Sequence, residues 1–209
     1  MKMKFYQSIK FRLMMMTLCV CVFMGGLISF YSIHQSRLSY KRLAWNYMVD
    51  IALAYGRQVE NLLDQGGSLD SGVLEHILMN ANLEGVESSY TYIVDSEGNM
   101  LYHPNKDKIG KSVENVIVKS YIQDLKSGIK HDTYVVEYDY NGSIKYAACY
   151  TDENGRFILV VSADDDAVLR DSASLIVRVT AISLLIGMAA IVVVFIFIRK
   201  IVAPLSYAT

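Results

Sequence analysis

Two long uncharged stretches dominate the hydrophobic pattern of the chain. Residues 13–33 and 179–198 contain no charged side chain. At about 1.5 Å per residue, a helix of some 20 residues crosses the roughly 30 Å of hydrocarbon in a bilayer. The pattern therefore predicts two transmembrane helices, which we place at 13–33 and 175–198.

The first stretch also has a feature of a secretory signal, because basic residues precede it. Its apolar run is longer than the roughly 7–15 residues of a signal core. In addition, the bulky Phe30, Tyr31 and Ile33 stand where a cleavage site needs small residues. We therefore expect an uncleaved membrane anchor.

The helical pattern continues beyond the first stretch as an apolar stripe with heptad-like spacing. The stripe ends before Gly66-Gly67, a pair suited to the left-handed conformation that terminates helices. It predicts a long helix that packs on its own domain and also forms a homodimer. The stripe consists of Leu38, Trp45, Met48, Ala52, Tyr55, Val59 and Leu62.

Between the two spans the pattern changes from helical to alternating. Asn141-Gly142 between two alternating segments is a strong hairpin signal. Five antiparallel strands with helices on one face predict an α+β domain. After the long helix, the predicted elements are a short helix at 70–80, strands at 90–94 and 100–103, a helix at 113–126, strands at 132–140, 143–150 and 156–162, and a last helix from about 164 into the second span.

The charges orient this arrangement. All 21 acidic residues lie between Asp50 and Asp171, and residues 36–174 hold 13 basic against 21 acidic side chains, a net charge of about −8. The flanking regions carry basic residues only, and short basic segments stay in the cytoplasm. We therefore expect a multi-pass protein of the plasma (inner) membrane, with cytoplasmic termini and an acidic domain at 34–174 outside. Such a domain disfavours nucleic acid as a partner.

Two adjacent segments carry a family resemblance. Residues 90–104 (YTYIVDSEGNMLYHP), followed by 108–111 (KIGK), resemble the central signature of Cache sensor domains, which are PAS-like modules of bacterial receptors. The distance between the spans leaves room for a single Cache domain. The resemblance implies a long N-terminal helix, a five-stranded antiparallel sheet and a small-molecule ligand.

The C-terminal residues carry a second resemblance. Residues 199–205 (RKIVAPL) look like the opening of a HAMP linker, which is truncated at 209. At the other end of the chain, residues 1–12 form the predicted cytoplasmic tail. Together the two resemblances imply the sensing and transmembrane part of a methyl-accepting chemotaxis protein, whose missing output domain meets cytoplasmic signalling partners. A sensor histidine kinase or a diguanylate cyclase shares this front end. An adhesion or structural ectodomain without a ligand is the third reading.

Catalytic patterns are missing from the sequence. It contains no His-Glu-x-x-His, no Gly-x-Ser-x-Gly and no phosphate-binding loop, and the histidines show no metal-type spacing. The carboxylates of residues 164–166 fit the start of a helix better than a metal site. We expect no enzymatic activity, metal or cofactor.

Aromatic residues and one lysine are the candidate ligand contacts. Lys145 lies in the middle of a strand whose neighbours Ile144 and Tyr146 share the opposite face. The resemblance implies that a basic residue on this strand meets the carboxylate of a short ligand. Tyrosines supply an apolar wall with a hydroxyl group. The candidate ligand-binding residues are Lys145, Tyr92, His103, Tyr90, Tyr134 and Tyr146.

The charge asymmetry generates a prediction about topology. In intact cells, a cysteine introduced at Asn141 should react with a membrane-impermeant thiol reagent, and one at Ser206 should not. Labelling at Ser206 without labelling at Asn141 would contradict the predicted orientation.

Overall fold

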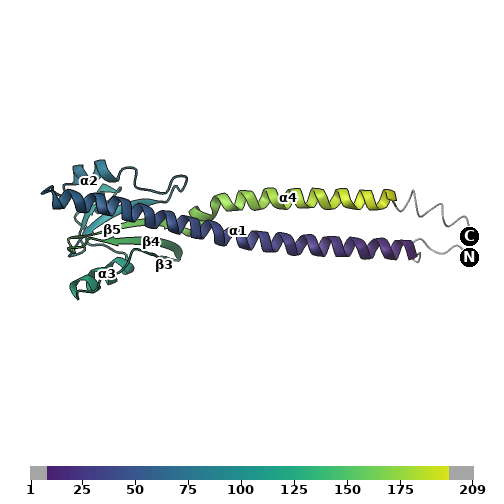
Figure 1. Ribbon diagram of the computed structural model, residues 1–209, viewed down its shortest axis with the longest axis horizontal. Helices are drawn as coiled ribbons and strands as arrows, with labels where there is room; N and C mark the ends of the chain where they lie inside the picture. Colours follow the sequence, from purple (N-terminus) through teal and green to yellow (C-terminus); the bar gives the residue numbers. More distant parts are fainter. Residues whose placement is uncertain (1–8, 198–209) are drawn as a thin grey trace, which may run out of the picture. The chain divides into compact units, whose positions relative to one another are not determined.

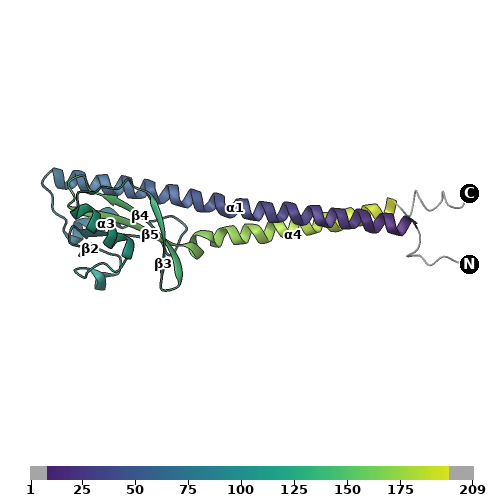
Figure 2. The same ribbon diagram turned by 90° about the horizontal axis from the view of Figure 1, so that it is seen from below.

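The structure is a computed structural model that describes residues 9–197. The predicted linker at 199–209 and most of the N-terminal tail lie outside the described residues. Residues 39–171 form one compact unit, and the helical segments before and after them form a second. Figures 1 and 2 show the elements of both units.

Two long helices contain the apolar stretches. Helix α1 spans Ile9–Asp64 and α4 spans Asp165–Phe197. By length and composition, both can cross a membrane. Large apolar side chains of these stretches are exposed, such as Phe30 at 75% and Val193 at 64%. An apolar surface of this kind is unfavourable in water and suits contact with lipid tails.

The unit at 39–171 is built on one antiparallel sheet with the order β2-β1-β5-β4-β3. Asn141 and Gly142 have φ angles of 55° and 83°, which close the β3–β4 hairpin as the sequence predicts. The five-stranded antiparallel sheet, the long N-terminal helix and the α+β class are confirmed. The strands are β1 (Tyr90–Asp95), β2 (Met100–Tyr102), β3 (Val135–Tyr140), β4 (Ser143–Thr151) and β5 (Phe157–Asp164).

Helices cover both faces of the sheet, so the prediction that they lie on one face is wrong. Helices α1 and α2 (Ser71–Leu78) pack with one set of alternate strand side chains. Helix α3 (Val116–Lys126) packs with the other set, on the opposite side of the strands (Figure 1). Because successive strand residues point to opposite faces, almost all of β4 and β5 is buried.

Helix α3 begins three residues later than the sequence predicts. Asn115 caps it, because its side chain accepts a hydrogen bond from the Ile117 N–H at 2.9 Å. Val113 instead donates its N–H to the Gly98 carbonyl at 2.8 Å. Residues 113–115 therefore stay outside the helix, beside the β1–β2 turn. A short 3₁₀ turn, η2 (Lys106–Lys108), lies earlier in the same connection.

The predicted apolar stripe of α1 packs on its own sheet. Met48, Ala52 and Val59 are fully buried in the core with strand residues. A second subunit therefore has no access to these three side chains. Homodimerisation itself stays a prediction, and other side chains of α1 would have to provide the contact.

The C-terminal end of this helix is tied to the β4–β5 turn by charged groups. Arg156 contacts Asp64 of α1 at 2.8 Å and holds the fully buried carboxylate of Asp152 through two bonds of 2.8 Å. Burial opposes ionisation of Asp152, but its hydrogen bonds with Arg156 outweigh burial and lower the pKa. The turn and the helix end are thereby joined.

Gly56 permits the close packing of α1 on β4. A Cβ atom at this position would lie 2.3 Å from the ring of Tyr150. Gly56→Ala should therefore destabilise residues 36–172 by about 1–3 kcal/mol despite the better helix propensity of alanine, measured by urea unfolding. Gly72→Ala in α2 is the matched control, since a Cβ there meets open space. Equal stabilities of the two variants would contradict this account of the packing.

Candidate ligand-binding site

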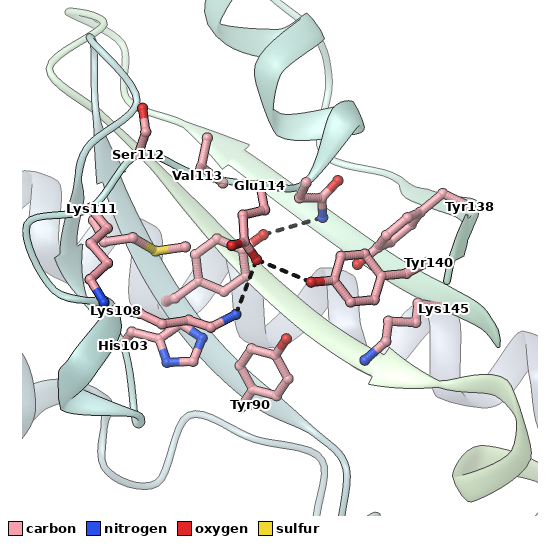
Figure 3. Close-up of a pocket in the computed structure, with 13 residues that line it drawn as sticks. Tyr90, His103, Lys108, Lys111, Ser112, Val113, Glu114, Tyr138, Tyr140 and Lys145 are labelled. Carbon is pink, nitrogen blue, oxygen red and sulfur yellow. Dashed lines mark hydrogen bonds and ion pairs between the residues drawn. The ribbon is translucent and has the colours of Figure 1, made fainter. Parts of the chain in front are cut away.

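A cavity of about 160 Å³ lies on the sheet face that α3 covers. Drug-sized ligands occupy pockets of roughly 300–1,000 Å³, so this cavity suits a smaller molecule. Strand residues form one side and the β2–α3 connection forms the other (Figure 3). Its lining consists of Tyr90, Tyr92, Met100, His103, Lys108, Lys111, Ser112, Val113, Glu114, Asn115, Tyr138, Tyr140 and Lys145.

The antiparallel register brings the strand residues of the pocket together. Lys145 on β4 pairs directly with Tyr138 on β3 and with Asp164 on β5. Residues that face each other across an antiparallel pair share a face of the sheet. Tyr140, two residues beyond Tyr138, therefore lies on the same face. A lysine, a carboxylate and two phenols converge in this way from three adjacent strands.

The β2–α3 connection forms the opposite wall because backbone hydrogen bonds hold it against β2. Met100 donates its N–H to the Lys111 carbonyl at 2.9 Å and accepts from the Gly110 N–H at 2.8 Å. Gly110 has a φ of 79°, a conformation that glycine adopts without strain. The turn directs Lys108, Lys111 and the residues after them toward the cavity.

Lys145 is paired with a carboxylate. Its Nζ lies 2.8 Å from Asp164 Oδ1, and the two side chains are only 18% and 35% exposed. The Nζ also lies 5.4 Å from the centre of the Tyr140 ring. Burial opposes the charge, but the hydrogen bond with Asp164 and the neighbouring acidic groups outweigh it and raise the pKa of Lys145. Lys145 is therefore a charged group whose charge Asp164 largely balances.

Glu114 contributes an exposed carboxylate to the lining of the cavity. Its carboxylate accepts a hydrogen bond from the Tyr140 hydroxyl at 3.1 Å and lies 3.5 Å from Lys108 Nζ (Figure 3). The hydrogen bond from Tyr140 and the charge of Lys108 lower the pKa of Glu114. This contact joins the β2–α3 connection to β3 across the opening.

An aromatic wall lies deeper in the pocket. The ring of His103 lies 5.2 Å from that of Tyr90 and 5.7 Å from that of Tyr92. Burial, with the nearby Lys108, lowers the pKa of His103, and its Nδ1 accepts the Asn105 N–H at 2.9 Å. His103 is therefore neutral at pH 7, with its proton on Nε2.

Tyr92 carries the most enclosed phenol of the cavity lining, and its surroundings determine its protonation state. The hydroxyl of Tyr92 accepts a hydrogen bond from Asn115 Nδ2 at 3.2 Å. Burial raises the pKa of Tyr92 well above its usual value, and burial likewise raises that of Tyr138 to about 12. Both phenols are therefore neutral and can donate hydrogen bonds to an anion.

Four of the six candidate residues from the sequence line this cavity: Lys145, Tyr92, His103 and Tyr90. Tyr146 does not, because alternation turns it to the opposite face, where it contacts Trp45 of α1 at 5.6 Å between ring centres and donates to Asp165. Tyr134 precedes β3 and lies beside Tyr121 outside the cavity. The structure therefore does not bring these two tyrosines together with Lys145 in this cavity.

Several lining residues were not among the sequence candidates. Tyr138 and Tyr140 could have been found from the Asn-Gly turn, because a two-residue loop fixes the register that pairs Tyr138 with Lys145. Lys108 and Lys111 lie in the Cache-like segment and were noted only as part of it. Glu114 carried no signal, since it falls where the sequence predicted the start of a helix.

The fold and the pocket define an α+β domain with a small polar cavity on one sheet face. In the sequence, this domain stands between two helical segments that are able to span a membrane by length and composition. No protein-family model and no curated protein matches the chain. The solved structures with which it shares some likeness include ligand-binding, sensor and extracellular domains.

Three of these structures illustrate the likeness. The ligand-binding domain of Mlp24 with asparagine is 12% identical, with a TM-score of 0.36, and the match covers 49% of this chain and 38% of that chain. The extracellular domain of the putative histidine kinase mmHK1S-Z3 is 24% identical, with a TM-score of 0.37, covering 49% and 40%. The sensor domain of E. coli DcuS is 16% identical, with a TM-score of 0.36, covering 61% and 90%. The chain thus spans less than half the length of the first two.

Proposed function

We propose that this chain is the sensing and membrane-spanning part of a bacterial chemoreceptor, and that its pocket binds a short carboxylate outside the cell. The observation that carries the proposal is the chemistry of the cavity. Three lysines and several phenols line a small space within an acidic domain, with Glu114 as the lining carboxylate. Asp164 and Glu114 balance two of these lysines, so the site keeps a small net positive charge that favours an anion against the net charge of the domain.

The phenols and the amide around the cavity favour a carboxylate over a spherical anion. A carboxylate has two oxygens that together accept several hydrogen bonds. Lysine ammonium groups, neutral tyrosine hydroxyls and the Nε2–H of His103 are donors for these oxygens. The aromatic rings of Tyr90, Tyr92 and His103 would cover the short apolar part of the ligand.

The remaining parts of the proposal concern the membrane and the output. In this proposal both termini are cytoplasmic, the C-terminal residues begin a HAMP linker, and ligand binding shifts the equilibrium between two arrangements of the membrane helices. A homodimer would use exposed α1 side chains such as Leu43 and Tyr47, which are 67% and 46% exposed. The alternative is that the output domain is a histidine kinase or a diguanylate cyclase. Sequence beyond Thr209 would distinguish these two outputs from that of a chemoreceptor.

Thermal unfolding of residues 36–172 with a panel of short mono- and dicarboxylates tests the proposal, with the corresponding neutral amides as controls. A ligand at about 100 times its Kd should stabilise the domain by roughly 2.7 kcal/mol and raise Tm by several degrees. Lys145→Met should abolish this rise because it removes the cation proposed to contact the carboxylate.

Lys119→Met is the matched control, since Lys119 is exposed on α3 and is not a lining residue. It should retain the full rise in Tm. A panel in which no carboxylate raises Tm, or a Lys145→Met domain that keeps the rise, would contradict the proposal.

A further inference from the structure

Lys145, the lysine proposed to receive the ligand, already has an internal carboxylate as its partner. Asp164 faces Lys145 across the β4–β5 pair, and the two side chains meet at 2.8 Å in a half-buried setting. Partial burial strengthens such a pair relative to a fully exposed one, because water screens it less. Lys145 is therefore not an empty anion receptor.

An incoming carboxylate must deal with this pair. The ammonium group of a lysine has three N–H donors, so it can in principle serve two acceptors. Two carboxylates at one ammonium group would, however, repel each other, and partial burial strengthens this repulsion. A ligand carboxylate that reaches Lys145 thus gains most when Asp164 moves away from it.

The position of Asp164 makes such a movement consequential. It is the last residue of β5, and α4 begins at the next residue. Its N–H donates to Ser88 Oγ at 3.0 Å, while the following Asp165 accepts a hydrogen bond from Tyr146 on the opposite face of the sheet. At the start of α4, Asp164 is thus held by Lys145 on one face of the sheet. The next carboxylate, that of Asp165, is held by Tyr146 on the other face.

We propose that Asp164 is a specificity-determining residue, an internal counter-ion that a ligand carboxylate must displace from Lys145. This inference rests on the proposed function, because it assumes that Lys145 receives the ligand. Asp164 lowers the affinity for all anions and so restricts the response to ligands with enough additional contacts to compete. Displacement releases a side chain at the β5–α4 junction.

The test measures binding of ¹³C-labelled acetate to the full chain in detergent. Acetate is the smallest stable carboxylate with an apolar group. Broadening of its NMR line reports binding. Asp164→Asn keeps the size of the side chain and removes its charge, so acetate should bind about tenfold more tightly or better, the equivalent of roughly 1.4 kcal/mol. Asp164→Ser, which is shorter and also uncharged, should give the same direction of change. Agreement of the two excludes an effect of asparagine itself.

Asp165→Asn is the matched control, because it removes the same charge one residue further along the chain. The carboxylate of Asp165 accepts a hydrogen bond from Tyr146 on the other face of the sheet. It should leave acetate affinity unchanged. An equal gain in Asp165→Asn would reduce the effect to overall charge and overturn the inference. Unchanged or weaker binding in Asp164→Asn would also overturn it, and weaker binding would mean that Asp164 contacts the ligand directly.

The double variant separates this inference from the proposed function. Adding Lys145→Met to Asp164→Asn should abolish the gain. If wild type binds acetate through Lys145 and Asp164→Asn changes nothing, the proposed function stands and this inference fails. If Asp164→Asn binds no acetate even with Lys145 released from its partner, this inference fails, and the proposed function is decided by the panel of carboxylates.

Discussion

The register of strand β4 is the constraint on which the site depends. Lys145 lies beside Tyr138 on one neighbouring strand and Asp164 on the other, and both partners follow from the same pairing. A slip of one residue would exchange the faces of the whole strand and place Tyr146 in the pocket and Lys145 under α1. The Asn141-Gly142 turn sets this register locally, and burial of β4 on both faces maintains it.

The two faces of the sheet have different roles. One face is an apolar core under α1, where the absence of a side chain at Gly56 lets the helix approach the ring of Tyr150. The other face is apolar beneath α3 and polar at the cavity, where loop and strand side chains meet. The first face fixes the strands, so that the second can hold charged and phenolic groups in a defined arrangement.

The sequence predicts what depends on local pattern. The apolar stretches, the glycine at the end of α1 and the Asn-Gly hairpin are local signals, and the structure has each of them. The sequence analysis did not predict helices on both faces of the sheet, because the apolar residues of α3 do not indicate which face of the sheet that helix covers. Asp164 was missed as the partner of Lys145 because the β4–β5 pairing joins residues 19 positions apart through the loop at 152–156, which is longer than the two-residue turn that would fix the register. Tyr146 lies on the opposite face from Lys145, as the alternation of strand side chains requires.

The central claim is that Lys145 contacts the carboxylate of a small ligand inside this cavity. The most direct measurement is a crystal structure of residues 36–172 grown with the carboxylate that raises Tm most. The account predicts a carboxylate oxygen within about 2.7–3.2 Å of Lys145 Nζ, with the remainder of the ligand against Tyr90, Tyr92 and His103. A ligand bound elsewhere, with Lys145 contacting Asp164 alone, would contradict it.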